Sequence, residues 1–126
     1  MALDMNPAVR AQWCAALRSG DYPQTDEALY RPQKEEGHPA GYCCLGVLTD
    51  LWLKAGHGEM IPDEYGETIS VWDQNDGELS PPVITWAGLE DGNPRLRPGT
   101  GGSAAHVNDS LVSFAAIADL IDGGAR

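Results

Sequence analysis

The strongest constraint on the fold is the run from Cys44 to Ala55, which is the most apolar segment of the chain. Its apolar residues recur at the spacing of one helical face, and a helix this apolar is expected at the centre of the core, ending at Gly56. Gly46 on its first turn costs about 1 kcal/mol relative to Ala, which predicts close approach by a neighbouring backbone. The residues of the apolar face are Cys44, Leu48, Leu51, Trp52 and Ala55.

Three further segments carry helix signals at both ends. Each begins with an Asn or Ser that can accept a hydrogen bond from an early backbone amide, and each ends at a glycine. In the first two segments proline follows this residue, and proline at the first helical position loses no hydrogen bond. The predicted helices run over Pro7–Ser19, from Ser80 to Gly88 and from Ser113 to Gly123.

Short strands are expected between these helices, where β-branched and aromatic residues stand between turn residues. An exposed loop over Pro32–Gly37 is expected to join the first two strands. A turn at Asn75-Asp76-Gly77 should follow the last one. The segment Leu89–Gly102 reads as a loop with one extended stretch around Leu96. The predicted strands are Ala28–Arg31, His38–Cys43, Met60–Ile61 and Thr68–Asp73.

The order of helices and strands predicts an α+β fold. With 15 glycines and 9 prolines among 126 residues, the elements should be short and the loops many. We expect a single small domain over residues 1–126, in which about three to four helices pack on short antiparallel strands. The core should be organised around Trp13, Leu48, Trp52, Phe114 and Ile117.

The charge is strongly acidic and unevenly spread. The net charge of −11 opposes attraction to phosphate backbones and anionic lipids, so we expect no direct binding to nucleic acid or membrane. The stretch Ala55–Pro94 holds nine carboxylates and no Lys or Arg. It either keeps the chain soluble, or docks a basic protein or imitates nucleic-acid charge. The expected acidic surface consists of Glu59, Asp63, Glu64, Glu67, Asp73, Asp76 and Glu78, within a variable middle of about residues 56–80.

The three cysteines argue against a disulfide framework. Their number is odd, and the adjacent pair Cys43 and Cys44 would be strained as a disulfide. A reducing compartment is therefore expected. The N-terminus lacks the basic and apolar parts of a signal peptide, and no apolar run is long enough to span a membrane. These features predict a cytoplasmic protein.

One arrangement of residues could support catalysis. Cys44 stands at a predicted helix start, where the helix dipole favours a thiolate, as in papain-like hydrolases. His106 could act as its base, with Asn108 or Asp109 orienting the imidazole. The competing interpretation is that Cys44 fills the core, because cysteine is commonly buried and its neighbours are apolar. We favour core packing and no catalytic residue.

A metal site is a weaker hypothesis. His38, Cys43, Cys44 and His57 are suitable zinc ligands, but adjacent cysteines point in different directions and structural zinc sites separate their cysteines by two to four residues. The stretch Asp73–Gly77 resembles a calcium loop only in part, because the ligand alternation is broken and no closing Glu follows. We therefore expect no metal and no cofactor.

Five polar residues are candidates for ligand or partner binding. Asn108 and Asp109 either form a local turn before the last helix or face a ligand. Arg18 and Gln24 either tie the first loop to the hairpin or line a cleft. These residues and Tyr22 form the predicted binding set, namely Arg18, Tyr22, Gln24, Asn108 and Asp109.

Several segments together resemble a family of small uncharacterised proteins of phages and prophages, especially those of actinobacteria. The similarity spans most of the chain and is interrupted by the acidic middle. In this pattern the position before the Asn-Asp pair is apolar, and His106 is not included. The segments that carry the resemblance are Trp13–Gly20, Tyr42–Leu48, Trp86–Gly88, Asn108–Asp109 and Ser113–Ile121.

The resemblance implies an accessory phage protein that acts in the host cytoplasm. Such proteins commonly inhibit or sequester a host or defence protein, or a small signalling ligand. The acidic charge adds a physical reason to expect a basic partner. We therefore expect a non-enzymatic binding module, with the cysteine hydrolase as the alternative and a virion assembly component as a third class.

Overall fold

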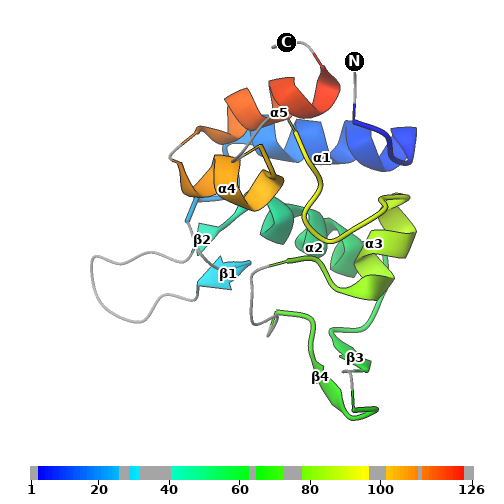
Figure 1. Cartoon of the computed structure of the whole chain (residues 1–126). Coiled ribbons are helices and arrows are strands. Elements are labelled where there is room, and N and C mark those ends of the chain that lie inside the picture. The colour runs from blue at the N-terminus through cyan, green and yellow to red at the C-terminus, as the bar shows by residue number, and fades with distance from the viewer. Residues whose placement is uncertain are drawn as a thin grey trace, which may run out of the picture.

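The computed structural model describes residues 3–25, 29–31, 41–62, 65–72, 78–96, 102–110 and 112–123, and its helices alternate with two short hairpins. Figure 1 shows α5 lying beside α1, with α2 beneath them and the hairpin of β3 and β4 extending away from the helices. The elements in chain order are α1 (Pro7–Ser19), β1 (Tyr30–Arg31), β2 (Gly41–Tyr42), α2 (Cys44–Lys54), β3 (Met60–Pro62), β4 (Thr68–Ser70), α3 (Pro81–Ala87), α4 (Ala104–Asp109) and α5 (Phe114–Asp122).

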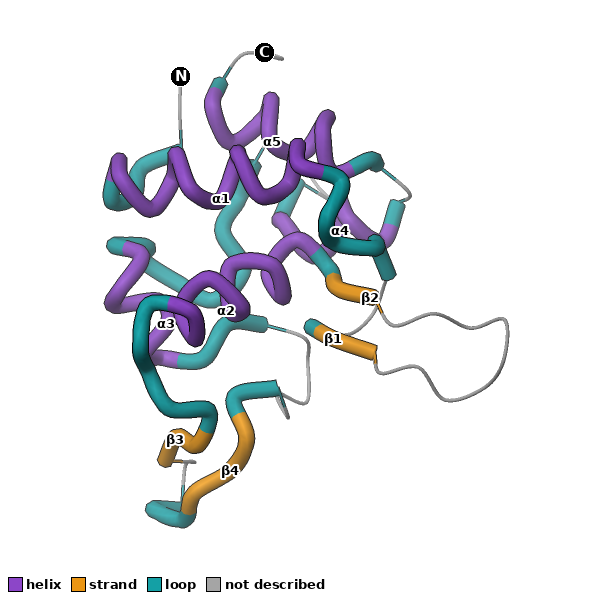
Figure 2. The backbone as a smooth tube through the Cα atoms, turned by 180° about the vertical axis from the view of Figure 1, so that it is seen from behind, coloured by secondary structure: helices purple, strands orange, loops and turns teal. Residues whose placement is uncertain are grey.

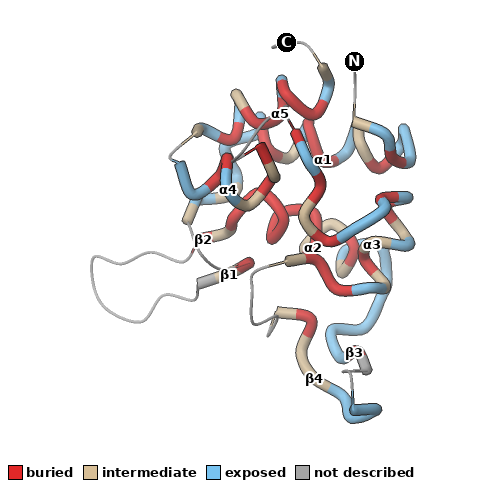
Figure 3. The backbone as a smooth tube through the Cα atoms, viewed as in Figure 1, coloured by how far each residue is buried: buried red, intermediate tan, exposed pale blue. Residues whose placement is uncertain are grey.

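Helix α2 is the centre of the molecule, as its apolar sequence predicts. It contacts α1, α3, α4 and β2, and every residue from Cys44 to Thr49 is buried. Figure 3 shows this buried start of α2 in the interior. The prediction of one buried face is wrong at the end of the helix, because Ala55 is exposed. The first half of α2 is enclosed on all sides, whereas its last turn reaches the surface.

The close approach predicted at Gly46 is confirmed. A Cβ added to Gly46 would lie 1.7 Å from the carbonyl oxygen of Leu29. The same carbonyl accepts a hydrogen bond of 3.2 Å from the backbone amide of Cys43, just before α2. The chain entering β1 therefore packs directly on the first turn of α2, where only a glycine leaves enough room.

The capping signals of the first and last helices are also confirmed. Asn6 Oδ1 accepts hydrogen bonds from the first amides of α1, and Ser113 Oγ accepts one of 3.2 Å from Ala116 of α5. Gly20 and Gly123 end the two helices in the left-handed conformation. The helices lie side by side in Figure 2 as they do in Figure 1.

The strands form two separate antiparallel pairs. In the first, Tyr30 faces Tyr42; in the second, Ile61 faces Ile69. The last strand is shorter than predicted and ends at Ser70, although Val71 still donates a backbone hydrogen bond of 2.8 Å to Glu59. The loop expected at 32–37, the turn at 75–77 and the partial calcium motif at 73–77 lie outside the described residues.

The sequence reasoning missed helix α4. His106 lies on this helix, as do Asn108 and Asp109, which were expected to form a local turn or to face a ligand. The first backbone amides of α4 donate to residues of the loop that precedes it, and no side chain at the start of the helix caps them. The amide of Ala104 donates to the carbonyl of Pro94 at 2.8 Å, and the amide of Ala105 donates to Asn93 Oδ1 at 2.8 Å.

The expected core and fold class are confirmed. The described residues form a single small α+β domain with five helices, one more than the upper expected number because of α4. Two two-stranded pairs complete the domain. The five expected core residues are all at most 7% exposed and belong to one hydrophobic cluster; they are Trp13, Leu48, Trp52, Phe114 and Ile117.

Candidate functional site

Both cysteines at the start of α2 are core residues. Cys43 Sγ caps the helix by accepting a hydrogen bond of 3.3 Å from the amide of Gly46, and Cys44 Sγ donates to the carbonyl of Ala104 at 3.5 Å. Burial raises the pKa of Cys43 to about 11 and holds the pKa of Cys44 well above its ordinary value. These thiols therefore remain protonated at neutral pH.

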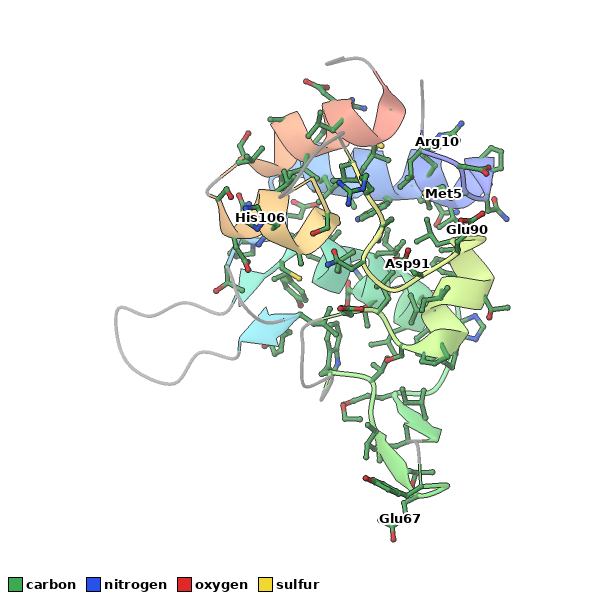
Figure 4. All side chains as sticks on the ribbon, viewed as in Figure 1. Met5, Arg10, Glu67, Glu90, Asp91 and His106 are labelled. Carbon is green, nitrogen blue, oxygen red and sulfur yellow. The ribbon has the colours of Figure 1, made fainter. Side chains whose placement is uncertain are left out.

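The geometry does not favour the cysteine hydrolase. Cys44 is 0% exposed, whereas His106 and Asp109 are exposed on α4, as Figure 4 shows for His106. A nucleophilic thiol needs access to substrate and a lowered pKa. Cys44 has neither. Burial outweighs the helix dipole at this position, because the thiol is enclosed by the core on every side.

Asn108 connects three parts of the chain in the interior. Its Oδ1 accepts hydrogen bonds from the backbone amide of Cys44 at 3.2 Å and from Gln24 Nε2 at 3.0 Å. Its Nδ2 donates to the carbonyl of Thr25 at 2.8 Å. Gln24 also donates to the carbonyl of Val112 at 2.7 Å. With Asn108 only 1% exposed, these amides hold the fold together rather than face a ligand.

Arg18 joins the two outer helices. Its guanidinium donates to Asp119 at 2.9 Å and to Asp122 at 2.8 Å, so it connects α1 to α5. It does not tie the first loop to the hairpin. The hydrogen bond from Arg18 lowers the pKa of Asp122 below its ordinary value. Arg18 and Gln24 are exposed, but both are engaged in bonds within the chain.

Tyr22 is different, because it lies in a partly exposed group of charged and aromatic side chains. Its hydroxyl donates a short hydrogen bond to Asp50 Oδ2 and accepts one of 2.9 Å from Lys54 Nζ. Lys54 also pairs with Asp50 at 3.0 Å, and its nitrogen lies 5.1 Å from the centre of the Tyr22 ring. Desolvation and the bond to Asp50 raise the pKa of Tyr22, so the phenol stays protonated.

Tyr22 is the first of four aromatic rings that contact one another in series across the surface. Their centres are 5.0 Å apart between Tyr22 and Tyr42, 4.9 Å between Tyr30 and Tyr42, and 5.5 Å between Tyr30 and Trp72. All four are partly exposed and come from different segments: the loop after α1, β1, β2 and the turn that follows β4. We call Tyr22, Tyr30, Tyr42 and Trp72 the aromatic surface.

The sequence pointed to Tyr22 alone among the residues of this site. One signal was available: Asp50 and Lys54 stand four residues apart on the polar side of the apolar helix, where such a pair meets. The two strand tyrosines meet because the register of β1 and β2 places Tyr30 opposite Tyr42. Trp72 joins them through tertiary contacts, for which the sequence carries no local signal.

The β3–β4 hairpin carries the two large apolar side chains that are most exposed among the described residues. Met60 is 58% exposed and Tyr65 is 83% exposed. Glu59 and Glu67 are exposed on the same hairpin, and Figure 4 shows Glu67 at its far end. Glu78 is half-buried, and the other predicted acidic residues, Asp63, Glu64, Asp73 and Asp76, lie outside the described residues.

Within the described part of the chain, no group of three His, Cys, Asp or Glu residues could hold a metal ion. None of the helices described is both long enough and apolar enough to cross a membrane.

The fold and site thus define a small α+β domain with a buried polar centre and a partly exposed aromatic surface. Residues 5–125 match the model of the family described as Domain of unknown function (DUF8296). The chain belongs to this family, so the expectation of an uncharacterised family is confirmed. No curated protein matches the chain. No solved structure matches it either.

Proposed function

We propose that this protein is a non-enzymatic binding module whose partner is a protein with a basic surface. The β3–β4 hairpin carries the proposal. It places the exposed side chains of Met60 and Tyr65 within Ala55–Pro94, the stretch that holds nine carboxylates and no cation. An apolar anchor surrounded by polar residues is typical of a protein interface, and Glu59 and Glu67 are exposed on the same hairpin.

The charge of the chain supports the same partner. A net charge of −11 attracts a basic protein over a distance of about 10 Å at moderate ionic strength and repels nucleic acid. Two of the amides predicted to bind a ligand or partner already bond within the chain: Asn108 is buried, and the exposed Gln24 donates to Asn108 and to Val112. The buried, protonated thiol of Cys44 favours binding over hydrolysis.

We further propose that the module is a phage-type accessory protein acting in the cytoplasm of an actinobacterial host, where it inhibits or sequesters a host or defence protein. The support is the sequence resemblance and the membership of a family without an assigned activity.

The test is affinity capture from an actinobacterial host lysate with three versions of the tagged chain. These are the wild type, the double variant Met60→Ser with Tyr65→Ser, and the control Gln12→Ala, an exposed position on α1. We expect one partner to be retained by the wild type and the control and lost by the double variant. Its retention should fall between about 0.05 M and about 0.5 M salt. Equal capture by all three, or capture that salt does not affect, would contradict the proposal.

A further inference from the structure

The aromatic surface already holds a cation. Lys54 Nζ contacts Asp50, the hydroxyl of Tyr22 and the face of the Tyr22 ring. The side chain of Lys54 is nevertheless 66% exposed, whereas that of Asp50 is 18% exposed. The carboxylate of Asp50 is therefore largely enclosed by its neighbours, and the ammonium of Lys54 contacts it from the solvent side.

Such an exposed pair is weak and exchangeable. Ion pairs that involve a solvent-exposed lysine gain little, because water competes for the ammonium and the long side chain loses conformational freedom. An incoming cation could replace Lys54 without disturbing the fold, since Lys54 stands on the last turn of α2 at the surface.

The surroundings of Asp50 fit a guanidinium better than a flat neutral ring. Four pairs of these rings are in contact, with centres 4.9 to 6.1 Å apart, and each of these pairs is edge-on or tilted rather than parallel. The cluster therefore leaves no slot between stacked rings for a base, and the net charge opposes a phosphate. A guanidinium can lie on an aromatic face and donate two hydrogen bonds to one carboxylate.

The aromatic surface is continuous along the chain with the proposed docking hairpin. Trp72 follows β4 by two residues, and the bond between Val71 and Glu59 holds this junction to the other strand at 2.8 Å. Trp72 in turn contacts Tyr30 and Tyr42. A segment bound along the hairpin could thus reach Asp50.

We propose that Asp50 and the aromatic surface form a subsite for an arginine side chain of the basic partner, with Lys54 as the internal cation that this arginine displaces. The inference rests on the proposed function and names the residue type that the partner supplies. It predicts opposite effects at two neighbouring positions: loss of the Asp50 charge weakens binding, whereas loss of the Lys54 charge strengthens it.

The experiment uses the full chain and the peptide Gly-Arg-Gly-Arg-Gly, with the same peptide containing citrulline in place of arginine as the uncharged control. Binding is followed by nuclear magnetic resonance through the indole N–H signal of Trp72, which a Trp72→Phe variant assigns. We expect the arginine peptide to shift this signal and the citrulline peptide to leave it unchanged. Asp50→Asn should weaken binding about tenfold, and Lys54→Met should tighten it about threefold.

The matched control is Asp119→Asn, which removes a paired carboxylate on α5, far along the chain from the site. This variant should bind the arginine peptide as the wild type does, and thermal unfolding should establish that each variant is folded. Equal binding of the two peptides, or weaker binding by Lys54→Met, would overturn the subsite.

The two proposals can fail separately. A lysate partner that depends on the hairpin, together with no response to the arginine peptide, would leave the binding module standing and remove the subsite. A response to the arginine peptide with no hairpin-dependent partner would remove the proposed function and leave the cation site.

Discussion

Gly46 determines how closely the chain before β1 can approach α2. Replacing a helical glycine by alanine usually stabilises a helix by about 1 kcal/mol, but here the new Cβ would lie 1.7 Å from the Leu29 carbonyl oxygen. We therefore expect Gly46→Ala to lower the free energy of unfolding by about 3 kcal/mol, through backbone displacement in a packed core. Urea unfolding measures this change. Gly58→Ala is the control, since nothing lies within 4 Å of its Cβ position, and a comparable loss there would contradict the steric explanation.

Replacing serine by alanine should change the stability of the protein in opposite directions at two helix starts. Ser80 Oγ is buried before α3 and has no hydrogen-bond partner among the described residues, whereas Ser113 Oγ caps α5. Ser80→Ala removes an unsatisfied polar group and should stabilise the protein by about 1 kcal/mol. Ser113→Ala removes a cap and should destabilise it by about 1 kcal/mol. Thermal unfolding of both variants checks the signs, and a loss in both would show that Ser80 has a partner after all.

At the scale of elements, the sequence predicts a helix correctly where the residues that cap it, bury it and end it are all close together in the chain. The bounds Pro7–Ser19 were predicted as observed, because the cap, the apolar face and the terminal glycine are all local. Helix α4 was missed because its first amides bond to Asn93 and Pro94, which belong to a preceding loop. Its six residues are also too few for a clear apolar period to appear in the sequence.

The contact between α1 and α5 should depend on acidity. Arg18 lowers the pKa of Asp122, so the carboxylate form is favoured in the folded state. The stabilisation is present above the ordinary pKa of 3.8 and is lost as the pH falls below it. We expect the free energy of unfolding to fall less between neutral and acidic pH in Arg18→Met than in the wild type. Urea titrations at several pH values measure this, and parallel curves for the two proteins would refute the role of the ion pair.

At the scale of the molecule, the candidate site was much harder to predict than the core. The core follows from apolar spacing within single segments, and all five residues expected there are buried. The aromatic surface combines the loop after α1, two short strands and the end of a second hairpin, while Asp50 comes from α2. Contacts between segments with so few local signals depend on the complete fold, so the sequence indicated Tyr22 without its neighbours.

The ionisation and reactivity of the three buried cysteines depend on whether the domain is folded. They also distinguish a binding module from a cysteine hydrolase. All are buried, and burial is the main cause that raises the pKa of Cys14 to about 12 and that of Cys43 to about 11. The unfolded thiols ionise near 9.0, so the stabilisation is complete below that pH and is lost as the pH rises beyond it. The unfolding temperature should therefore decrease as the pH rises above 9.0.

Alkylation tests the same burial directly. At about pH 8, iodoacetamide should leave the native chain unmodified and give three adducts per chain in urea, as mass spectrometry can count. Reaction of the native protein then requires opening of the core, so its rate should follow global stability and increase in Gly46→Ala. A single thiol that reacts rapidly in the native wild type would place a nucleophile in contact with water. That result would restore the hydrolase, because binding through the hairpin has no use for an exposed thiolate.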